Sequence, residues 1–424
     1  MSEKTLTDAI QSHKVYKKIL VLMGILFILS QLFFIMPFSW STSPVKTIRI
    51  GVIAPFDEYA SYDEVLFKQI LEPEINEYIA KLPRNRFRPV TNVEFVIESA
   101  SWDPEKNLEI VKKFHNDGIN LLIGGHYTYL AASALDYVNA HGMIMISPSS
   151  TGTELSIEGD NLFRLVPDDV GQVNAIAEML HSKGIENLVI IQRDDSRTND
   201  IAAELLIKYS GMLIGVSKYA VGTIDFTECL TAAETMITGQ TNAGVLLLSL
   251  DEAGLLLDSS TAYPVLSSLE WFGSDGTAEQ PDVLTYAGAQ ACNVKLYSPM
   301  TAYSPETATS SKHLYMKTLF EGVTGYPFGF YTACEIDAGW LLVLGVLETQ
   351  RSLEPFVVGQ DIADVFPDIA SRYYGYSGWC ELNAAGDRVP GNYDIHGYGY
   401  VDGDPDFVIF GRYNTASNTI TWFP

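Results

Sequence analysis

Short apolar runs alternate with amphipathic helical segments along most of this chain, and this alternation constrains the fold more than any other feature. Runs rich in Val, Ile and Leu are typical of parallel strands that are covered on both faces. Between them, apolar residues recur at helical spacing, as at Leu108, Val111 and Phe114. The pattern predicts an α/β fold built on doubly wound parallel sheets. The expected strands cover residues 47–54, 93–99, 121–124, 143–147, 188–192, 212–216, 244–250 and 294–297.

Residues 374–424 differ in composition, being rich in Gly, Tyr, Asn and Asp. Strand patterns at 379–382, 407–413 and 419–423, with a turn at 383–387, predict antiparallel hairpins. Because isolated hairpins are only marginally stable in water, we expect them to pack on the α/β body.

The N-terminal region contains a candidate membrane segment. Residues 19–38 carry no charged side chain, and this run is long enough to cross a hydrocarbon layer of roughly 30 Å. Lysines precede it, so the positive-inside rule places residues 1–18 in the cytoplasm and the chain after the linker at 39–46 outside. The segment is either an uncleaved anchor or a long signal peptide. Either reading predicts export, with the rest of the chain extracellular or periplasmic.

Size, charge and motifs limit the function classes. A chain of 424 residues exceeds one hydrophobic core, which predicts two lobes. Its formal net charge of -25 repels phosphate backbones, so nucleic acid is not an expected partner. No HExxH, GxSxG, P-loop or Rossmann signature occurs, so we expect no enzyme, no metal and no cofactor. His126 is accordingly expected to be a hydrogen-bonded loop residue.

The four cysteines are Cys229, Cys292, Cys334 and Cys380, which lie too far apart for a CxxC metal site. In an oxidising compartment they can form disulfides, in any of three pairings. We favour a bridge between Cys334 and Cys380, and buried free thiols are the alternative.

Two expected strands, 121–124 and 143–147, end in loops rich in Gly, Ser and Thr. An open α/β sheet binds ligands at the carboxyl ends of its strands, and N–H groups at a helix N-terminus stabilise anions. The segment 271–276 ends another apolar strand and adds the carboxylate of Asp275. Hydroxyls for an anion and an acid for a cation predict a pocket for a small zwitterion.

Six short blocks follow one another in a recognisable order. They are Asp103-Pro104 with 118–124, then 146–151, 163–169, 273–276, Tyr331 with Asp337-Ala338, and 375–378 with 386–388. In this order they resemble the type I periplasmic-binding-protein superfamily, and they are most similar to the leucine/isoleucine/valine-binding proteins of ABC importers. The resemblance covers residues 45–410 and extends to the ligand-binding region of metabotropic glutamate receptors.

The resemblance implies two α/β lobes joined by a three-crossover hinge, which close on a ligand. Lobe 1 would comprise residues 45–162 and 300–372, and lobe 2 would comprise residues 163–299 and 373–424.

The resemblance assigns the ligand's α-carboxylate to hydroxyl groups of lobe 1, namely Thr128, Ser149, Ser150 and Thr151. The alternative is that these side chains only cap the helices that follow them.

For the ligand's ammonium, the resemblance points to Asp275 and Asp169, and less directly to Asp251 and Glu252. A buried carboxylate needs a cationic partner, or its pKa rises until it is neutral. The alternative is a turn aspartate satisfied by backbone N–H groups. Tyr331 resembles an aromatic residue of the cleft.

Two segments depart from the family pattern. Residues 56–62 follow the first strand without the usual glycines, and we expect Tyr59 and Tyr62 to supply aromatic walls instead. Residues 193–199 occupy the position of an aromatic-Gly pair in relatives. We expect Arg197 in this segment to contact an acidic side chain of the ligand.

The function that the resemblance implies is an extracytoplasmic solute-binding protein of an ABC importer, with permease subunits as partners. It would capture a branched-chain amino acid or a similar small zwitterion by cleft closure. The alternatives are a membrane-anchored sensory ectodomain and a binding protein for a neutral amide or urea.

Overall fold

The computed structural model describes residues 47–82, 92–350 and 358–424. The predicted membrane segment at 19–38 lies outside these residues. Within them, helix α13 (Phe330–Thr349) is long and apolar enough to cross a membrane, but 78% of its most apolar stretch is buried. Burial of that kind is expected of the core helix of a globular lobe.

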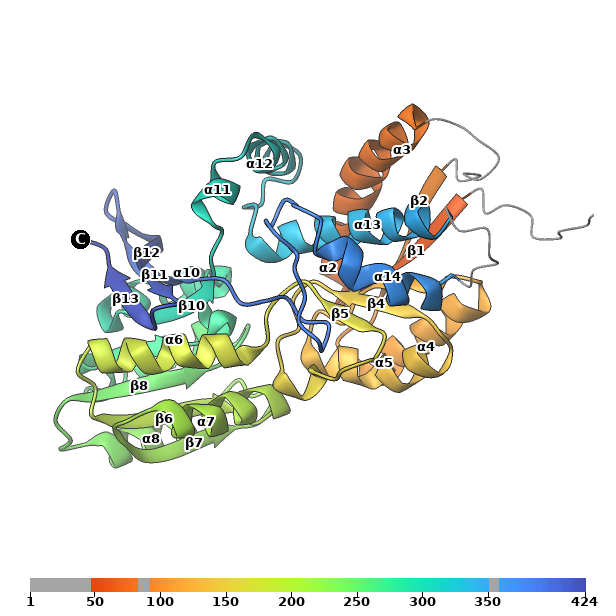
Figure 1. Ribbon diagram of the computed structural model, residues 1–424. Helices are drawn as coiled ribbons and strands as arrows, with labels where there is room; N and C mark the ends of the chain where they lie inside the picture. Colours follow the sequence, from red (N-terminus) through yellow and green to blue (C-terminus); the bar gives the residue numbers. More distant parts are fainter. Residues whose placement is uncertain (1–46, 83–91, 351–357) are drawn as a thin grey trace, which may run out of the picture. The chain divides into compact units, whose positions relative to one another are not determined.

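The first sheet has five parallel strands in the order β2-β1-β3-β4-β5. Helices α4 and α5 cover one face, while α13, α14, α3 and the π-helix η1 cover the other (Figure 1). We call this sheet and its helices the first lobe. Its strands are β1 (Thr47–Ala54), β2 (Asn92–Ser99), β3 (Leu121–Ile123), β4 (Ile144–Ser147) and β5 (Leu162–Arg164). Its helices are α2 (Asp57–Asp63), η1 (Glu64–Leu71), α3 (Glu72–Lys81), α4 (Pro104–Asn116), α5 (Thr128–Ala140), α13 and α14 (Gln360–Ala370).

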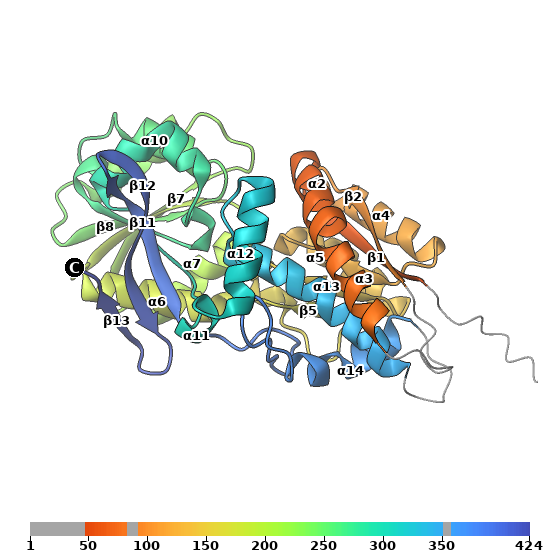
Figure 2. The same cartoon turned by 90° about the horizontal axis from the view of Figure 1, so that it is seen from above.

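The second sheet has eight strands in the order β13-β12-β11-β10-β9-β8-β6-β7. Strands β6 to β10 pair in parallel, and β11 to β13 continue the sheet as antiparallel hairpins. Figure 2 shows this sheet between α10 on one face and α6 on the other. We call this sheet and its helices the second lobe. Its strands are β6 (Asn187–Arg193), β7 (Met212–Tyr219), β8 (Ala243–Leu248), β9 (Glu270–Gly273), β10 (Tyr297–Thr301), β11 (Tyr393–Val401), β12 (Asp404–Asn414) and β13 (Thr419–Trp422). Its helices are α6 (Asp169–Ser182), α7 (Ser196–Lys208), α8 (Thr227–Ile237), α9 (Ala253–Ser260) and α10 (Pro281–Val294).

The chain passes between the two sheets three times, after β5, after β10 and after α14. The second passage leads through α11 (Pro305–Ala308) to α12 (Ser311–Thr324), whose Met316 and Phe320 join the core of the first lobe. The predicted α/β fold with parallel sheets is therefore confirmed.

Two strand expectations are wrong. Residues 379–382 form no strand, because Trp379 and Leu382 make only isolated bridges to Tyr374 and Arg388. The strand expected at 294–297 starts only at Tyr297, since α10 continues through Val294.

The expected bridge between Cys334 and Cys380 is also wrong, since all four cysteines are free thiols. Cys334 Sγ lies 3.3 Å from the carbonyl oxygen of Leu165, and Cys380 Sγ lies 3.9 Å from a carboxylate oxygen of Asp337. Burial raises the pKa of the Cys334 thiol and that of the Cys380 thiol, the latter to about 12. Both side chains are therefore protonated core thiols.

Candidate ligand-binding cleft

A cavity of about 630 Å³ is lined by loops at the carboxyl ends of strands from both sheets. Six of the seven predicted site residues line it, and Asp169 lies behind the wall, 2% exposed. The six are Thr128, Ser149, Ser150, Thr151, Asp275 and Tyr331.

The N-terminus of α5 forms one wall of the cavity. Its N-cap residue, Tyr127, makes no side-chain capping bond, and the first helical residue is the buried Thr128. The Gly152 N–H donates to Thr128 Oγ1 at 3.1 Å. Thr128 therefore also holds the loop that follows β4, which we call the second loop. Within the described residues, the N–H groups of Thr128 and Tyr129 have no protein acceptor. Unpaired N–H groups at a helix N-terminus are a ready site for an anion.

Two of the predicted hydroxyls are already used by the protein. Ser149 Oγ donates to the carbonyl oxygen of His126 at 2.9 Å, and Ser150 Oγ donates to Ser147 Oγ at 2.7 Å. Ser147 Oγ donates in turn to the carbonyl oxygen of Gly125 at 2.9 Å. These bonds tie the two loops together and use the hydroxyl hydrogens of Ser149 and Ser150 within the protein, while a role of either residue in ligand binding stays a prediction.

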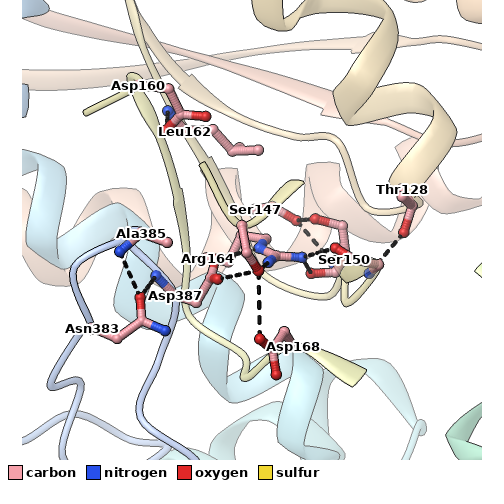
Figure 3. Close-up of polar contacts among 12 residues, drawn as sticks. Thr128, Ser147, Ser150, Asp160, Leu162, Arg164, Asp168, Asn383, Ala385 and Asp387 are labelled. Atoms are coloured by element: carbon pink, nitrogen blue, oxygen red, sulfur yellow. Dashed lines mark hydrogen bonds and ion pairs between the residues drawn. The ribbon is translucent and has the colours of Figure 1, made fainter. Parts of the chain in front are cut away.

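Arg164, at the end of β5, holds the loop that follows β4 through hydrogen bonds (Figure 3). The side chain is fully buried, and its Nε lies 2.5 Å from Asp387 Oδ1. Arg164 Nη1 donates to the carbonyl oxygens of Ser150 and Gly152, at 3.2 Å and 2.7 Å. Ser156 joins this network, since its hydroxyl accepts from Arg164 Nη2 at 2.8 Å and donates to Asp387 Oδ2 at 2.7 Å. A buried ion pair thus positions the loop at the first passage between the lobes.

The acids expected to meet a ligand's ammonium are paired inside the protein. Arg197 Nη2 donates to Asp169 Oδ1 at 3.2 Å and also to Asp275 Oδ1. Asp275 Oδ2 accepts from the Tyr331 hydroxyl at 2.6 Å, and Gln172 Nε2 donates to Asp169 Oδ1 at 2.9 Å. The expected contact between Arg197 and an acidic side chain of the ligand stays a prediction, and the guanidinium in addition compensates both carboxylates of the protein.

Asp251 is a carboxylate of the cavity wall that lacks such a partner. Glu252 beside it accepts from the Tyr219 hydroxyl at 2.8 Å and lies 3.6 Å from Arg193 Nη1. Arg193 Nε is also paired with Asp195, at 2.5 Å. Within the described residues, Asp251 makes no hydrogen bond or ion pair. Partial removal from water, together with the charge of Glu252, raises the pKa of the Asp251 carboxyl.

Aromatic rings form much of the remaining wall. Tyr59, Trp102, Tyr127 and Tyr129 line the cavity, and Trp102 stacks on Phe56 with ring centroids 4.5 Å apart. Aliphatic lining is limited to Pro55, Val221 and Leu250 among the described residues.

The expectation for Tyr62 is wrong. Tyr62 does not line the cavity, because its hydroxyl is bonded to Thr332 Oγ1 at 2.7 Å within the first lobe.

A buried acidic cluster under this wall was missed at the sequence level. Glu335 of α13 is fully buried and accepts from the Tyr59 hydroxyl at 2.5 Å, while His126 Nε2 lies 3.0 Å from the same oxygen. Asp63 of α2 is fully buried as well, and neither of its carboxylate oxygens has a hydrogen-bond partner among the residues that the structure describes. The sequence signal for this cluster was an acidic residue at a core-facing position of a helix. Such a residue alone does not show whether its side chain is buried. His126 is a hydrogen-bonded loop residue, as expected.

A family model described as receptor family ligand binding region matches residues 81–400, which is more than half of the chain. The chain belongs to this family. The predicted resemblance to type I periplasmic binding proteins is therefore confirmed, and the fold and family are those of substrate-binding proteins.

Two curated proteins are similar in sequence. An uncharacterised protein of Methanocaldococcus jannaschii is 25% identical over 402 residues, which is 90% of this chain and 93% of that protein. A Leu/Ile/Val-binding protein homolog of Brucella melitensis is 24% identical over 277 residues, covering 61% of this chain and 73% of that protein.

Two solved structures share the fold. The branched-chain amino acid transporter substrate-binding protein of Streptococcus pneumoniae, in complex with isoleucine, has a TM-score of 0.66 at 18% identity. It is covered completely and matches 86% of this chain. A solute-binding protein of R. palustris, in complex with benzoate, has a TM-score of 0.67 at 16% identity, covering 86% of this chain and 96% of its own.

Proposed function

We propose that this protein is an extracytoplasmic solute-binding protein of an ABC importer that captures a small zwitterion, such as a branched-chain amino acid. The observation that carries the proposal is the cavity between the two sheets. Its wall combines N–H groups at the N-terminus of α5 with the carboxylate of Asp251, none of which has a partner in the described part of the chain. Helix N–H groups suit a ligand carboxylate, and a carboxylate suits an ammonium.

In this proposal, lobe 1 (45–162 and 300–372) and lobe 2 (163–299 and 373–424) close about the three passages of the chain. Ligand stabilises the closed form because it contacts both lobes. Residues 19–38 anchor the binding domain at the outer face of the cell membrane. The permease subunits of the importer receive the ligand.

The ammonium assignment moves from Asp275 to Asp251 in this proposal. All four carboxylate oxygens of Asp169 and Asp275 accept hydrogen bonds from protein donors. A ligand ammonium at Asp275 would have to displace Arg197, whereas at Asp251 it would displace only water.

The test is a thermal-shift screen of the purified protein against amino acids, followed by calorimetry on the compounds that stabilise it. Asp251→Asn should weaken amino-acid binding about tenfold or more, since a charge-assisted hydrogen bond contributes roughly 1.5–3 kcal/mol. Asp225→Asn is the matched control, because Asp225 is an acid of the second lobe that does not line the cavity. Equal loss in both variants, or no loss in Asp251→Asn, would contradict the ammonium assignment.

A neutral amide or urea is the second candidate ligand class. It is favoured by the pairing of Arg197 with Asp169 and Asp275. Because Arg197 compensates both carboxylates, neither needs an ammonium group from the ligand. Such a ligand should bind wild type and Asp251→Asn with similar affinity, which distinguishes it from a zwitterion in the same calorimetric series.

A further inference from the structure

Arg197 occupies a position where a cation is electrostatically disfavoured. It lies in the first turn of α7, and the dipole of that helix favours negative charge there. Its side chain is only 13% exposed, yet it lines the cavity. A partly buried guanidinium in this place requires compensation, and Asp169 and Asp275 provide it.

The donors of Arg197 are unevenly used. Nε donates to Thr151 Oγ1 at 3.0 Å and to Asp169 Oδ2 at 3.2 Å, and Nη2 donates to both carboxylates. Nη1 has no hydrogen-bond partner in the described part of the chain. Since a guanidinium carries five N–H donors in a fixed plane, two of them are uncommitted at the cavity.

The contact with Thr151 brings the Arg197 guanidinium to the loop that forms part of the anion site. Thr151 follows β4 of the first sheet, whereas Arg197 belongs to the second lobe, so the 3.0 Å bond crosses the cleft. Thr128, at the N-terminus of α5, is tied to the same loop through Gly152. Both lobes therefore present donors to one region of the cavity.

We propose that Arg197 completes the carboxylate subsite from the second lobe, with Nη1 donating to the ligand carboxylate that Thr128 and the α5 N-terminus hold from the first lobe. This inference rests on the proposed function and narrows its ligand class to molecules with a free carboxylate. Asp169 and Asp275 are then positioning residues, which hold the guanidinium in place rather than bind ligand. The carboxylate itself becomes the group that draws the lobes together.

The number of protons taken up when a ligand binds gives an independent test of this role of Arg197. With both acids ionised, the group of Asp169, Arg197 and Asp275 carries a net negative charge, which opposes an incoming anion. Burial raises the pKa of the Asp169 carboxyl, although Arg197 opposes this shift. An anion at Nη1 weakens the hold of Arg197 on Asp169, so binding of a carboxylate should take up protons.

The experiment compares carboxylates with their own carboxamides. The probes are L-leucine, L-isoleucine, L-glutamate and benzoate, each paired with the corresponding primary amide and measured by thermal shift and calorimetry. Wild type should prefer the carboxylate, and Arg197→Gln should lose about 10- to 100-fold in carboxylate affinity and most of the preference. Calorimetry in two buffers of different ionisation enthalpy should show proton uptake in wild type and much less in the variant.

Arg197→Gln leaves two carboxylates uncompensated and could lower affinity by destabilising the fold. A second variant that also removes these two charges separates the two effects. The triple variant Arg197→Gln, Asp169→Asn, Asp275→Asn removes the cation together with both counter-charges, and it should lose the carboxylate preference as the single variant does. Arg412→Gln is the matched control, because Arg412 is an arginine of the second lobe that is paired with Asp394 and does not line the cavity.

The outcomes separate this inference from the proposed function. Retained carboxylate preference in the triple variant overturns the role of Arg197 and leaves the proposed function standing. Equal loss in Arg412→Gln also overturns it, since the effect would then be one of general charge. No binding of any probe to wild type overturns the proposed function, and this inference with it.

Discussion

The buried acid Asp63 gives the sharpest prediction about stability. Asp63 is fully buried at the end of α2, and both of its carboxylate oxygens lack a hydrogen-bond partner within the described ranges 47–82, 92–350 and 358–424. Burial, and then the charges of Glu335 and Glu64, raise the pKa of Asp63 well above its ordinary value. The folded protein therefore holds a proton on Asp63 where the unfolded chain has lost it.

The sign of the pH dependence follows from this extra proton. In the unfolded chain, an aspartate ionises near pKa 3.9. Between that value and the raised folded pKa, the native state binds one proton more than the unfolded state, so the free energy of unfolding falls as pH rises. The slope reaches at most about 1.4 kcal/mol per pH unit for one proton, and the loss ends at the folded pKa of Asp63.

Asp63→Asn keeps the size of the side chain and removes the titration. Urea unfolding of both proteins between about pH 5 and pH 8 should show a steeper fall in wild type, by up to about 1.4 kcal/mol per pH unit over the affected range. Glu109→Gln, on the exposed face of α4, measures the effect of losing one surface carboxylate. Parallel pH profiles for wild type and Asp63→Asn would refute the reasoning, because Asp63 would then carry no extra proton in the fold.

Three further outcomes follow from the contacts of the cleft. Asp387→Asn should lower the free energy of unfolding by about 3–5 kcal/mol in denaturant titrations, because it leaves Arg164 charged and unpaired in a dry site. Thr151→Val keeps the shape but removes the acceptor for Arg197 Nε, and calorimetry should show about a tenfold or greater loss of carboxylate affinity with little change in melting temperature. A verified ligand should reduce the radius of gyration in small-angle scattering, and an unchanged radius at saturation would contradict lobe closure.

Most of the α/β body was predictable because its signals are local. Strands β1 to β4 and β6 to β9 lie in apolar runs, and the helices between them repeat apolar residues on one face. The three-residue strand β5 was not among the expected strands. The errors occur where local signals compete. The run around Val294 is apolar enough for a strand, yet it ends α10 and packs with Ala287 and Ala291 in the core of the second lobe. A short apolar run cannot separate a buried helix end from a strand.

The missed strand β11 shows the opposite case. Tyr393–Val401 contains aromatic and β-branched residues that favour a strand, but two glycines, an aspartate and a histidine interrupt their pattern. It forms because β10 on one side and β12 on the other satisfy its backbone groups. Strand propensity of this kind depends on neighbours that are distant in sequence.

The loops of the cleft were predictable, but the use of their hydroxyls was not. A serine after a strand can donate to a ligand or to the protein, and composition does not distinguish the two. Ser149 donates to a carbonyl of the other loop, at His126, and this bond exists only once β3 and β4 are paired. Thr128 and Thr151 differ from the serines in that their hydroxyl oxygens accept protein hydrogen bonds, from Gly152 N–H and Arg197 Nε.

The acids of the cleft show why a carboxylate alone cannot identify a ligand. Asp275 stood at the position of a ligand-binding acid, and the structure does place it at the cavity wall. Its partner, however, is Arg197, which belongs to the segment 193–199 that departs from the family pattern. A buried charge must be compensated. The role of Asp275, which matches the family pattern, therefore depends on Arg197, which does not. In the structure, the arginine of this segment pairs with both acids that the sequence had suggested for a ligand ammonium, which is why the proposed function assigns the ammonium to Asp251 instead.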